Sequence, residues 1–139
     1  MKKIIGFSVL ALFAVAILAG CGGGGQKYAE VKDILNKMVT IQETFTTAVD
    51  GAKTPKDVVA AINTFAADMM TLAPKMKELD KKYPELSSKT PPKELAPEVE
   101  KLKAVSEKMG TAMTKVAQKY PGNKEIADAF MKFAGAAMK

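Results

Sequence analysis

The chain contains no histidine and no tryptophan, and its single cysteine is Cys21. Without histidine it lacks the side chain that most often serves as a general base or a metal ligand. A single cysteine can form neither an internal disulfide nor a paired-cysteine zinc site. A serine nucleophile would need a lysine base, and no Ser-x-x-Lys pair occurs. We therefore expect no enzymatic activity, no catalytic residues and no bound cofactor.

Arginine is also absent, so all 21 basic residues are lysines, against 15 acidic residues and a net charge of +6. Lysine lacks the planar, bidentate fork that suits phosphates and base edges. The basic excess therefore does not predict nucleic-acid binding; it is typical of solvated helix faces that carry mixed lysine and glutamate. With 139 residues, the chain has room for one domain.

A basic start and a short apolar run open the sequence. Lys2 and Lys3 precede residues 4–19, which carry no charge and are mostly apolar. As a helix this run would be about 24 Å long, short of the roughly 30 Å hydrocarbon core of a bilayer. The small residues at its end are typical of an export signal.

The next residues, Leu18-Ala19-Gly20-Cys21, resemble the lipobox of bacterial lipoproteins. The resemblance implies cleavage between Gly20 and Cys21, a diacylglyceryl group on the Cys21 sulfur, and in many bacteria acylation of the new amino group. In lipoproteins of the enteric type, Asp after the cysteine implies inner-membrane retention. Gly22 at this position favours the outer membrane. The alternative is that Cys21 is an ordinary small residue of a cleaved or spanning segment.

These features predict three segments. Residues 1–20 form the cleaved signal peptide, residues 21–25 carry the lipid and a flexible glycine tether, and residues 26–139 form the domain. Two or more acyl chains anchor a protein firmly, since each buried methylene contributes about 0.8 kcal/mol. The expected location is the cell envelope, facing the periplasm or the cell exterior, with the lipid bilayer as one partner.

Apolar residues recur at alternating steps of three and four along the domain, which predicts four amphipathic helices. The stripes are Val31, Ile34, Met38, Ile41, Phe45 and Ala48; Val58, Ile62, Phe65, Met69, Leu72, Met76, Leu79 and Tyr83; Val99, Leu102, Val105, Met109, Met113, Val116 and Tyr120; and Ile126, Phe130, Phe133 and Ala137. No alternation of strand length appears. The short connections at 51–54 and 121–123 predict antiparallel neighbours.

Helix boundaries are marked by residues that favour caps and turns. Gly51 suits a left-handed residue beyond the first helix. Thr54, Pro55 and Asp57 predict a capping box for the second. The long connection 85–96 leads to a third helix that begins at Pro97, or earlier at Thr90-Pro91, and Asn123 can cap the fourth.

Pro74 lies inside the second stripe. It cannot donate to the Met70 carbonyl, and since the apolar rhythm continues beyond it, we expect a kinked helix and not two helices. The kink either bends the helix around the bundle or frees carbonyls near Met70 to line a site.

A short repeat closes the second and third helices. Met76-x-x-Leu79-x-x-Lys82-Tyr83-Pro84 matches Met113-x-x-Val116-x-x-Lys119-Tyr120-Pro121. We interpret each copy as an apolar ridge that ends in a tyrosine with its hydroxyl in water, followed by a proline stop.

The predicted fold class is all-α, an antiparallel up-down four-helix bundle with its second helix kinked at Pro74. In size, helix number and the early Met38 it resembles the exported b-type bundle cytochromes and cytochrome c-prime. The chain has no Cys-x-x-Cys-His motif and no histidine in its last helix, so the resemblance implies fold alone and no haem.

Methionines are the most suggestive chemical feature. Met109 and Met113 share one helical face, and with Met69 and Met76 they offer thioethers for Cu(I), a soft metal. The same residues fall on the apolar stripes, where methionine is an ordinary core residue.

The function that we expect is a membrane-anchored module that binds another envelope protein or has a structural role. The candidate contact residues are Lys101, Lys108 and Lys115, spaced by sevens along the third helix and pointing away from its apolar stripe. Small-ligand or Cu(I) binding by the four methionines is the alternative. A holdase-type chaperone would require exposed apolar surface.

Overall fold

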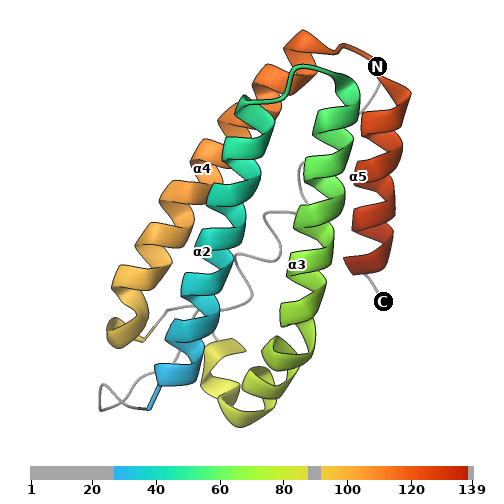
Figure 1. Cartoon of the computed structure of the whole chain (residues 1–139). Coiled ribbons are helices and arrows are strands. Elements are labelled where there is room, and N and C mark those ends of the chain that lie inside the picture. The colour runs from blue at the N-terminus through green and yellow to red at the C-terminus, as the bar shows by residue number, and fades with distance from the viewer. Residues whose placement is uncertain (1–26, 88–91, 138–139) are drawn as a thin grey trace, which may run out of the picture.

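The structure, a computed structural model, describes residues 27–87 and 92–137. The predicted signal peptide 1–20 and the predicted lipid-carrying tether 21–25 lie outside the described residues. Every element in the described ranges is helical (Figure 1): α2 (Ala29–Asp50), α3 (Pro55–Lys82), α4 (Ala96–Lys119), α5 (Lys124–Ala137) and the short 3-10 helices η1 (Pro84–Ser87) and η2 (Lys93–Leu95). The prediction of an all-α fold with four helices is confirmed.

The start of α3 has the capping box that the sequence predicts. The Asp57 backbone N–H donates to the Thr54 hydroxyl over 3.3 Å, and the Thr54 backbone N–H donates to Asp57 Oδ2 over 2.8 Å. A further N–H, from Lys53, reaches the same oxygen at 3.0 Å. These bonds satisfy backbone donors that a helix start otherwise leaves without a partner.

The capping box makes stability depend on pH. Hydrogen bonds from the Thr54 backbone, the Thr54 side chain and the Lys53 backbone lower the pKa of Asp57 below its ordinary value of 3.8. A carboxyl with a depressed folded-state pKa stabilises the fold above its unfolded pKa, and this contribution is lost as the pH falls through the folded value. We expect Asp57→Asn to have a lower melting temperature than the parent at pH 7, with the difference shrinking below about pH 4. Thermal unfolding from pH 7 to pH 2 measures this; a constant difference would contradict it.

The two glycine-containing turns differ. Gly51 ends α2 without adopting the left-handed conformation that we expected, because its φ is −82° and its N–H makes an ordinary helical bond to the Thr47 carbonyl at 3.0 Å. Gly122 does adopt it, with φ of +69°. The predicted cap of α5 is present, since the Ile126 N–H donates to Asn123 Oδ1 over 3.1 Å.

The repeated Lys-Tyr-Pro sequences end α3 and α4. In each copy a lysine ammonium lies over the ring of the tyrosine that follows, at 5.4 Å for Lys82 and Tyr83 and 5.3 Å for Lys119 and Tyr120. The expected wet hydroxyl is wrong for Tyr120. Its oxygen is buried and has no hydrogen-bond partner within the part of the chain that the structure describes. The ring packs against the core and carries the hydroxyl in with it.

The connection before α4 is built from η1 and η2, and its residues 88–91 lie outside the described ranges. Leu86 and Leu95 are fully buried and pack into the same core as Tyr28. Because α4 begins at Ala96, beside Pro97, the later of the two predicted starts is correct. Pro74 lies within α3, which continues through it as one helix, as the continuous apolar rhythm predicts.

The most extensive helix contacts join α2 with α4, α2 with α3, and α3 with α5. In Figure 1, α2 and α3 lie side by side, with α4 next to α2 and α5 next to α3. Although a short turn joins α4 to α5, these two helices are not among the extensive pairs. Their residues Val116 and Ile126 both join Val58 of α3 in a shared core. Each of these extensive contacts therefore involves α2 or α3, the two helices that lie between α4 and α5.

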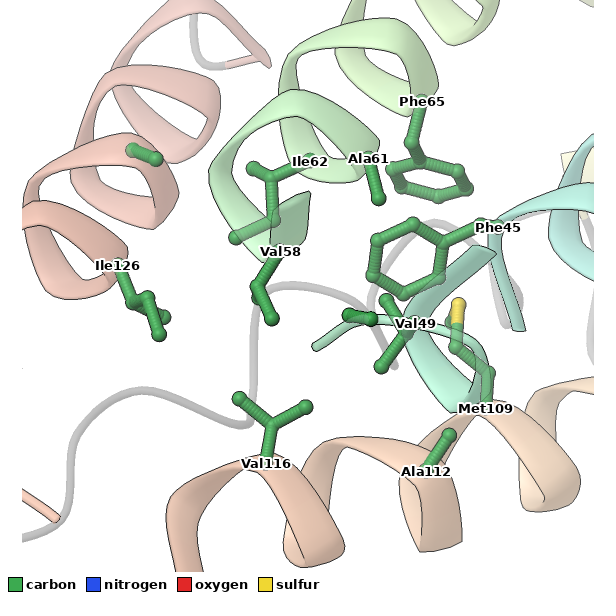
Figure 2. Packing of buried hydrophobic residues seen from close by; sticks show 12 residues of the cluster. Phe45, Val49, Val58, Ala61, Ile62, Phe65, Met109, Ala112, Val116 and Ile126 are labelled. Carbon is green, nitrogen blue, oxygen red and sulfur yellow. The ribbon is translucent and has the colours of Figure 1, made fainter. Parts of the chain in front are cut away.

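The core has two parts. The Tyr28 cluster lies where α2 begins and α3 ends: Tyr28, Val31, Ile34, Leu35, Met38, Leu72, Leu79, Tyr83, Leu86, Leu95 and Leu102. The Phe45 cluster lies at the other end: Phe45, Val49, Ala52, Val58, Ala61, Ile62, Phe65, Met109, Ala112, Val116, Ile126 and Ala129. Figure 2 shows the Phe45 cluster receiving side chains from all four helices. Only the Phe45 cluster includes α5.

The first predicted stripe is wrong at two positions. Ile41 is only partly buried and Ala48 is exposed, whereas Gln42 and Val49 are buried in α2. An α-helix has 3.6 residues per turn, so its buried face departs gradually from a strict seven-residue repeat. In α2 the buried positions therefore shift by one residue, from Ile41 and Ala48 to Gln42 and Val49. Gln42 is accommodated because its Oε1 accepts a hydrogen bond from the Ser106 hydroxyl of α4 at 2.9 Å.

Candidate functional surfaces

The predicted lysine row, Lys101, Lys108 and Lys115, lies on the solvent side of α4, and all three residues are exposed. The residues that follow them, Leu102, Met109 and Val116, are buried. Lys115 Nζ is 3.5 Å from Asp50 Oδ1 of α2, so this ammonium also links two helices. A partner would therefore meet a row of three ammonium groups, one of which is already paired.

The four methionines of the metal hypothesis are divided between the two cores. Met109 is a buried member of the Phe45 cluster, and the partly buried Met113 and Met69 pack against it. Met76 packs against the Tyr28 cluster instead. Met69 also packs against the Tyr28 cluster, so it lies where the two cores meet, and Met109 and Met113 are the two that belong to the Phe45 cluster alone.

Tyr28 fixes the start of the domain. It is fully buried, its ring centroid is 5.5 Å from that of Tyr83, and its hydroxyl donates to Glu85 Oε1 over 3.2 Å. Lys27 Nζ lies 2.7 Å from the same oxygen. The first described residues are therefore held against the end of α3 and η1.

Ion pairs between elements gather at this end. Lys82 Nζ of α3 lies 2.6 Å from Glu30 Oε2 of α2, and Lys32 Nζ lies 3.8 Å from Glu98 Oε1 of α4. The hydrogen bond to Glu85 raises the pKa of Lys27, and that from Lys27 lowers the pKa of Glu85. Similarly, Glu30 raises the pKa of Lys82. These ion pairs join the start of α2 to its neighbours.

A groove of about 310 Å³ lies between α2 and α3 and is lined by residues of these two helices alone. Its floor includes the rings of Phe45 and Phe65, whose centroids are 4.9 Å apart. Its walls carry small side chains: Thr44, Ala48, Ala60, Ala61 and Thr64. Alanine and threonine side chains are small, so these positions leave space between α2 and α3 that larger residues would fill.

Two carboxylates border the groove. Asp57 lies at the start of α3, and Asp68 is 11 residues further along the same helix, about 16 Å away and on nearly the same face. The capping hydrogen bonds go to Asp57 Oδ2. None of the lysines is among the lining residues. Although the chain has a net charge of +6, both charged side chains that line the groove are acidic.

The groove is not among the sites predicted from the sequence. Its signal is present, since Thr44 and Ala48 of α2 and Ala60 and Thr64 of α3 are small residues spaced by four, which places each pair on one helical face. The sequence alone does not show that these two small-residue faces lie opposite each other, so it could not predict a groove between them.

Other kinds of site have little support in the described ranges. They contain no group of three or more His, Cys, Asp or Glu side chains placed to hold a metal ion, and no helix long and apolar enough to cross a membrane. The large apolar side chains exposed there are Met70 and Met131. Comparison with protein-family models, with curated proteins and with solved structures found no match to this chain.

Proposed function

We propose that this chain is a bacterial lipoprotein whose residues 1–20 are removed, whose Cys21 carries fatty acid, and whose helical domain faces the periplasm or the cell exterior. The observation that carries the proposal is the only thiol of the chain directly after Leu18-Ala19-Gly20, behind a short apolar run. Gly22 favours the outer membrane. Support also comes from Tyr28, which begins the packed domain a few residues after the tether.

The position of Tyr28 sets the orientation of the domain in this proposal. Because the tether leads directly to Tyr28, the Tyr28 cluster lies next to the membrane. With 22 residues, α2 extends about 33 Å from there. The turns at residues 51–54 and 120–123 and the Phe45 cluster then lie on the side away from the bilayer.

For the architecture we propose the antiparallel up-down four-helix bundle, with a bend of α3 at Pro74. Support for the bundle comes from the short turns before α3 and α5 and from the core that all four helices share. Support for the bend comes from the missing N–H of Pro74 and from the clash of its ring with the preceding turn.

The role of the domain in this proposal is non-enzymatic: it binds another envelope protein or has a structural role. The exposed lysine row of α4 is the first candidate surface, since its ammonium groups can pair with carboxylates of a partner. Three lysines at seven-residue spacing present charge along about 21 Å of helix.

A photo-reactive residue at the exposed position Thr111, between Lys108 and Lys115, tests the lysine row in cells. We expect one defined adduct with an envelope protein, and we expect Lys108→Glu to reduce its yield about tenfold, because attraction becomes repulsion. Lys103→Glu, which reverses an exposed charge off the row, is the control and should leave the yield unchanged. If only monomer is recovered, the lysine row does not bind a partner protein.

The second candidate function is Cu(I) binding by thioethers. It is favoured by the placement of Met69, Met109 and Met113 around the Phe45 cluster. Anaerobic titration of the full chain with Cu(I) tests it. This candidate requires a stoichiometric complex that is lost in Met109→Leu/Met113→Leu, a swap that a core tolerates at under about 1.5 kcal/mol per site. If no complex forms, the candidate is excluded.

A further inference from the structure

The groove between α2 and α3 has the features of a docking surface that the described part of the chain does not cover. It combines an apolar floor, at Phe45 and Phe65, with small walls that allow close approach. Both rings are nearly buried, whereas the lining residues Ala60 and Thr64 are exposed, so the groove is open to solvent. Its volume of about 310 Å³ suits a few inserted side chains better than a whole helix.

The carboxylates define the charge of the occupant. Asp57 and Asp68 border the groove about 16 Å apart, and no lysine joins them in the lining. An acidic ligand, such as an anionic phospholipid headgroup, would meet repulsion at both positions. A cationic ligand would be attracted at both.

The spacing of the carboxylates suggests the form of the occupant. A partner helix that lies along the groove rises by the same 1.5 Å per residue as α3. Basic residues 11 positions apart on such a helix lie on nearly the same face and match the separation of Asp57 and Asp68. Apolar side chains between them would enter the space over Phe45 and Phe65, as in other helix-in-groove complexes.

Two other occupants fit less well. Residues 21–26 span at most about 21 Å when extended, whereas Phe45 lies about 25 Å along α2 from Tyr28, so a membrane-held tether does not reach the middle of the groove. A second copy that docks by the same face would bring the carboxylates of both chains together, which is destabilising.

We propose that the α2–α3 groove binds an amphipathic helix of another protein, with Lys or Arg at positions 11 apart paired with Asp57 and Asp68 and with apolar side chains seated over Phe45 and Phe65. This inference rests on the proposed function, since it names a surface and a partner chemistry for a protein-binding module. It is separate from the lysine row, whose partner would be acidic.

Photo-crosslinking of the full chain in its host cells tests the proposal. A photo-reactive residue at Thr64 probes the groove, and the same residue at Thr111 on α4 is the matched control, since both are exposed helical threonines. The crosslinked segment is then identified by mass spectrometry. The expected result is a segment of another protein with helical apolar spacing and basic residues 11 positions apart.

Charge variants add a second readout. Asp68→Lys should reduce the adduct from Thr64 about tenfold and leave that from Thr111 unchanged, while Asp80→Lys, an exposed change on the same helix, should reduce neither. An adduct with a second copy, with lipid or with a segment that lacks basic residues would overturn the proposal, as would no adduct from Thr64. If Thr111 still gives its adduct, the protein-binding role stands and the groove proposal alone is wrong; if both probes are silent, both are wrong.

Discussion

Replacing Phe65 with alanine is expected to lower the free energy of unfolding by about 3–5 kcal/mol. Phe65 is 4% exposed, and its ring lies 4.9 Å from that of Phe45 and 5.4 Å from that of Phe133, measured between centroids. It thus joins α2, α3 and α5. A loss of this size is a large fraction of the roughly 5–15 kcal/mol that stabilises a typical domain. Urea unfolding followed by circular dichroism measures it.

The matched control for Phe65→Ala is Met131→Ala on α5. Met131 is 65% exposed, so its truncation removes little buried surface and should change the free energy of unfolding by less than about 0.5 kcal/mol. If Phe65→Ala cost less than about 1 kcal/mol, the aromatic contacts between α2, α3 and α5 would not stabilise the domain as described.

Replacing Cys21 with alanine is expected to abolish lipid attachment completely, because the chain has no other thiol. Incorporation of labelled palmitate should fall to background, and the precursor should keep residues 1–20. The variant would then lack the acyl chains of the parent, each of whose buried methylenes contributes about 0.8 kcal/mol to membrane binding.

Gly23→Ala is the control for Cys21→Ala. It changes the tether and leaves both the cysteine and the residues before it unchanged, so labelling and processing should match the parent. Palmitate label that persists in Cys21→Ala would show that the attachment site lies elsewhere in the chain.

Much of the secondary structure is local and could be predicted. Thr54 and Asp57 lie three residues apart and need only each other to form the capping box, and Asn123 caps α5 in the same way. Tyr83 and Tyr120 end their helices because the residue before a proline is driven from helical backbone angles. Signals of this kind involve residues within one turn of each other.

The features that could not be predicted depend on residues far apart in sequence. The burial of Gln42 depends on Ser106, and the burial of Tyr28 depends on Tyr83 and Glu85. The extensive pairing of α2 with α4 depends on the summed contacts of two long faces. The groove forms because small residues of α2 lie opposite small residues of α3, and the sequence of either helix alone does not reveal this pairing.

The most direct test of the lipoprotein proposal is the mass of the N-terminal peptide of the protein purified from its own membranes. The account predicts a peptide that begins at Cys21 and carries the added mass of a diacylglyceryl group, with or without a third acyl chain. A peptide that still begins with residues 1–20, or a Cys21 thiol without lipid, would contradict the account.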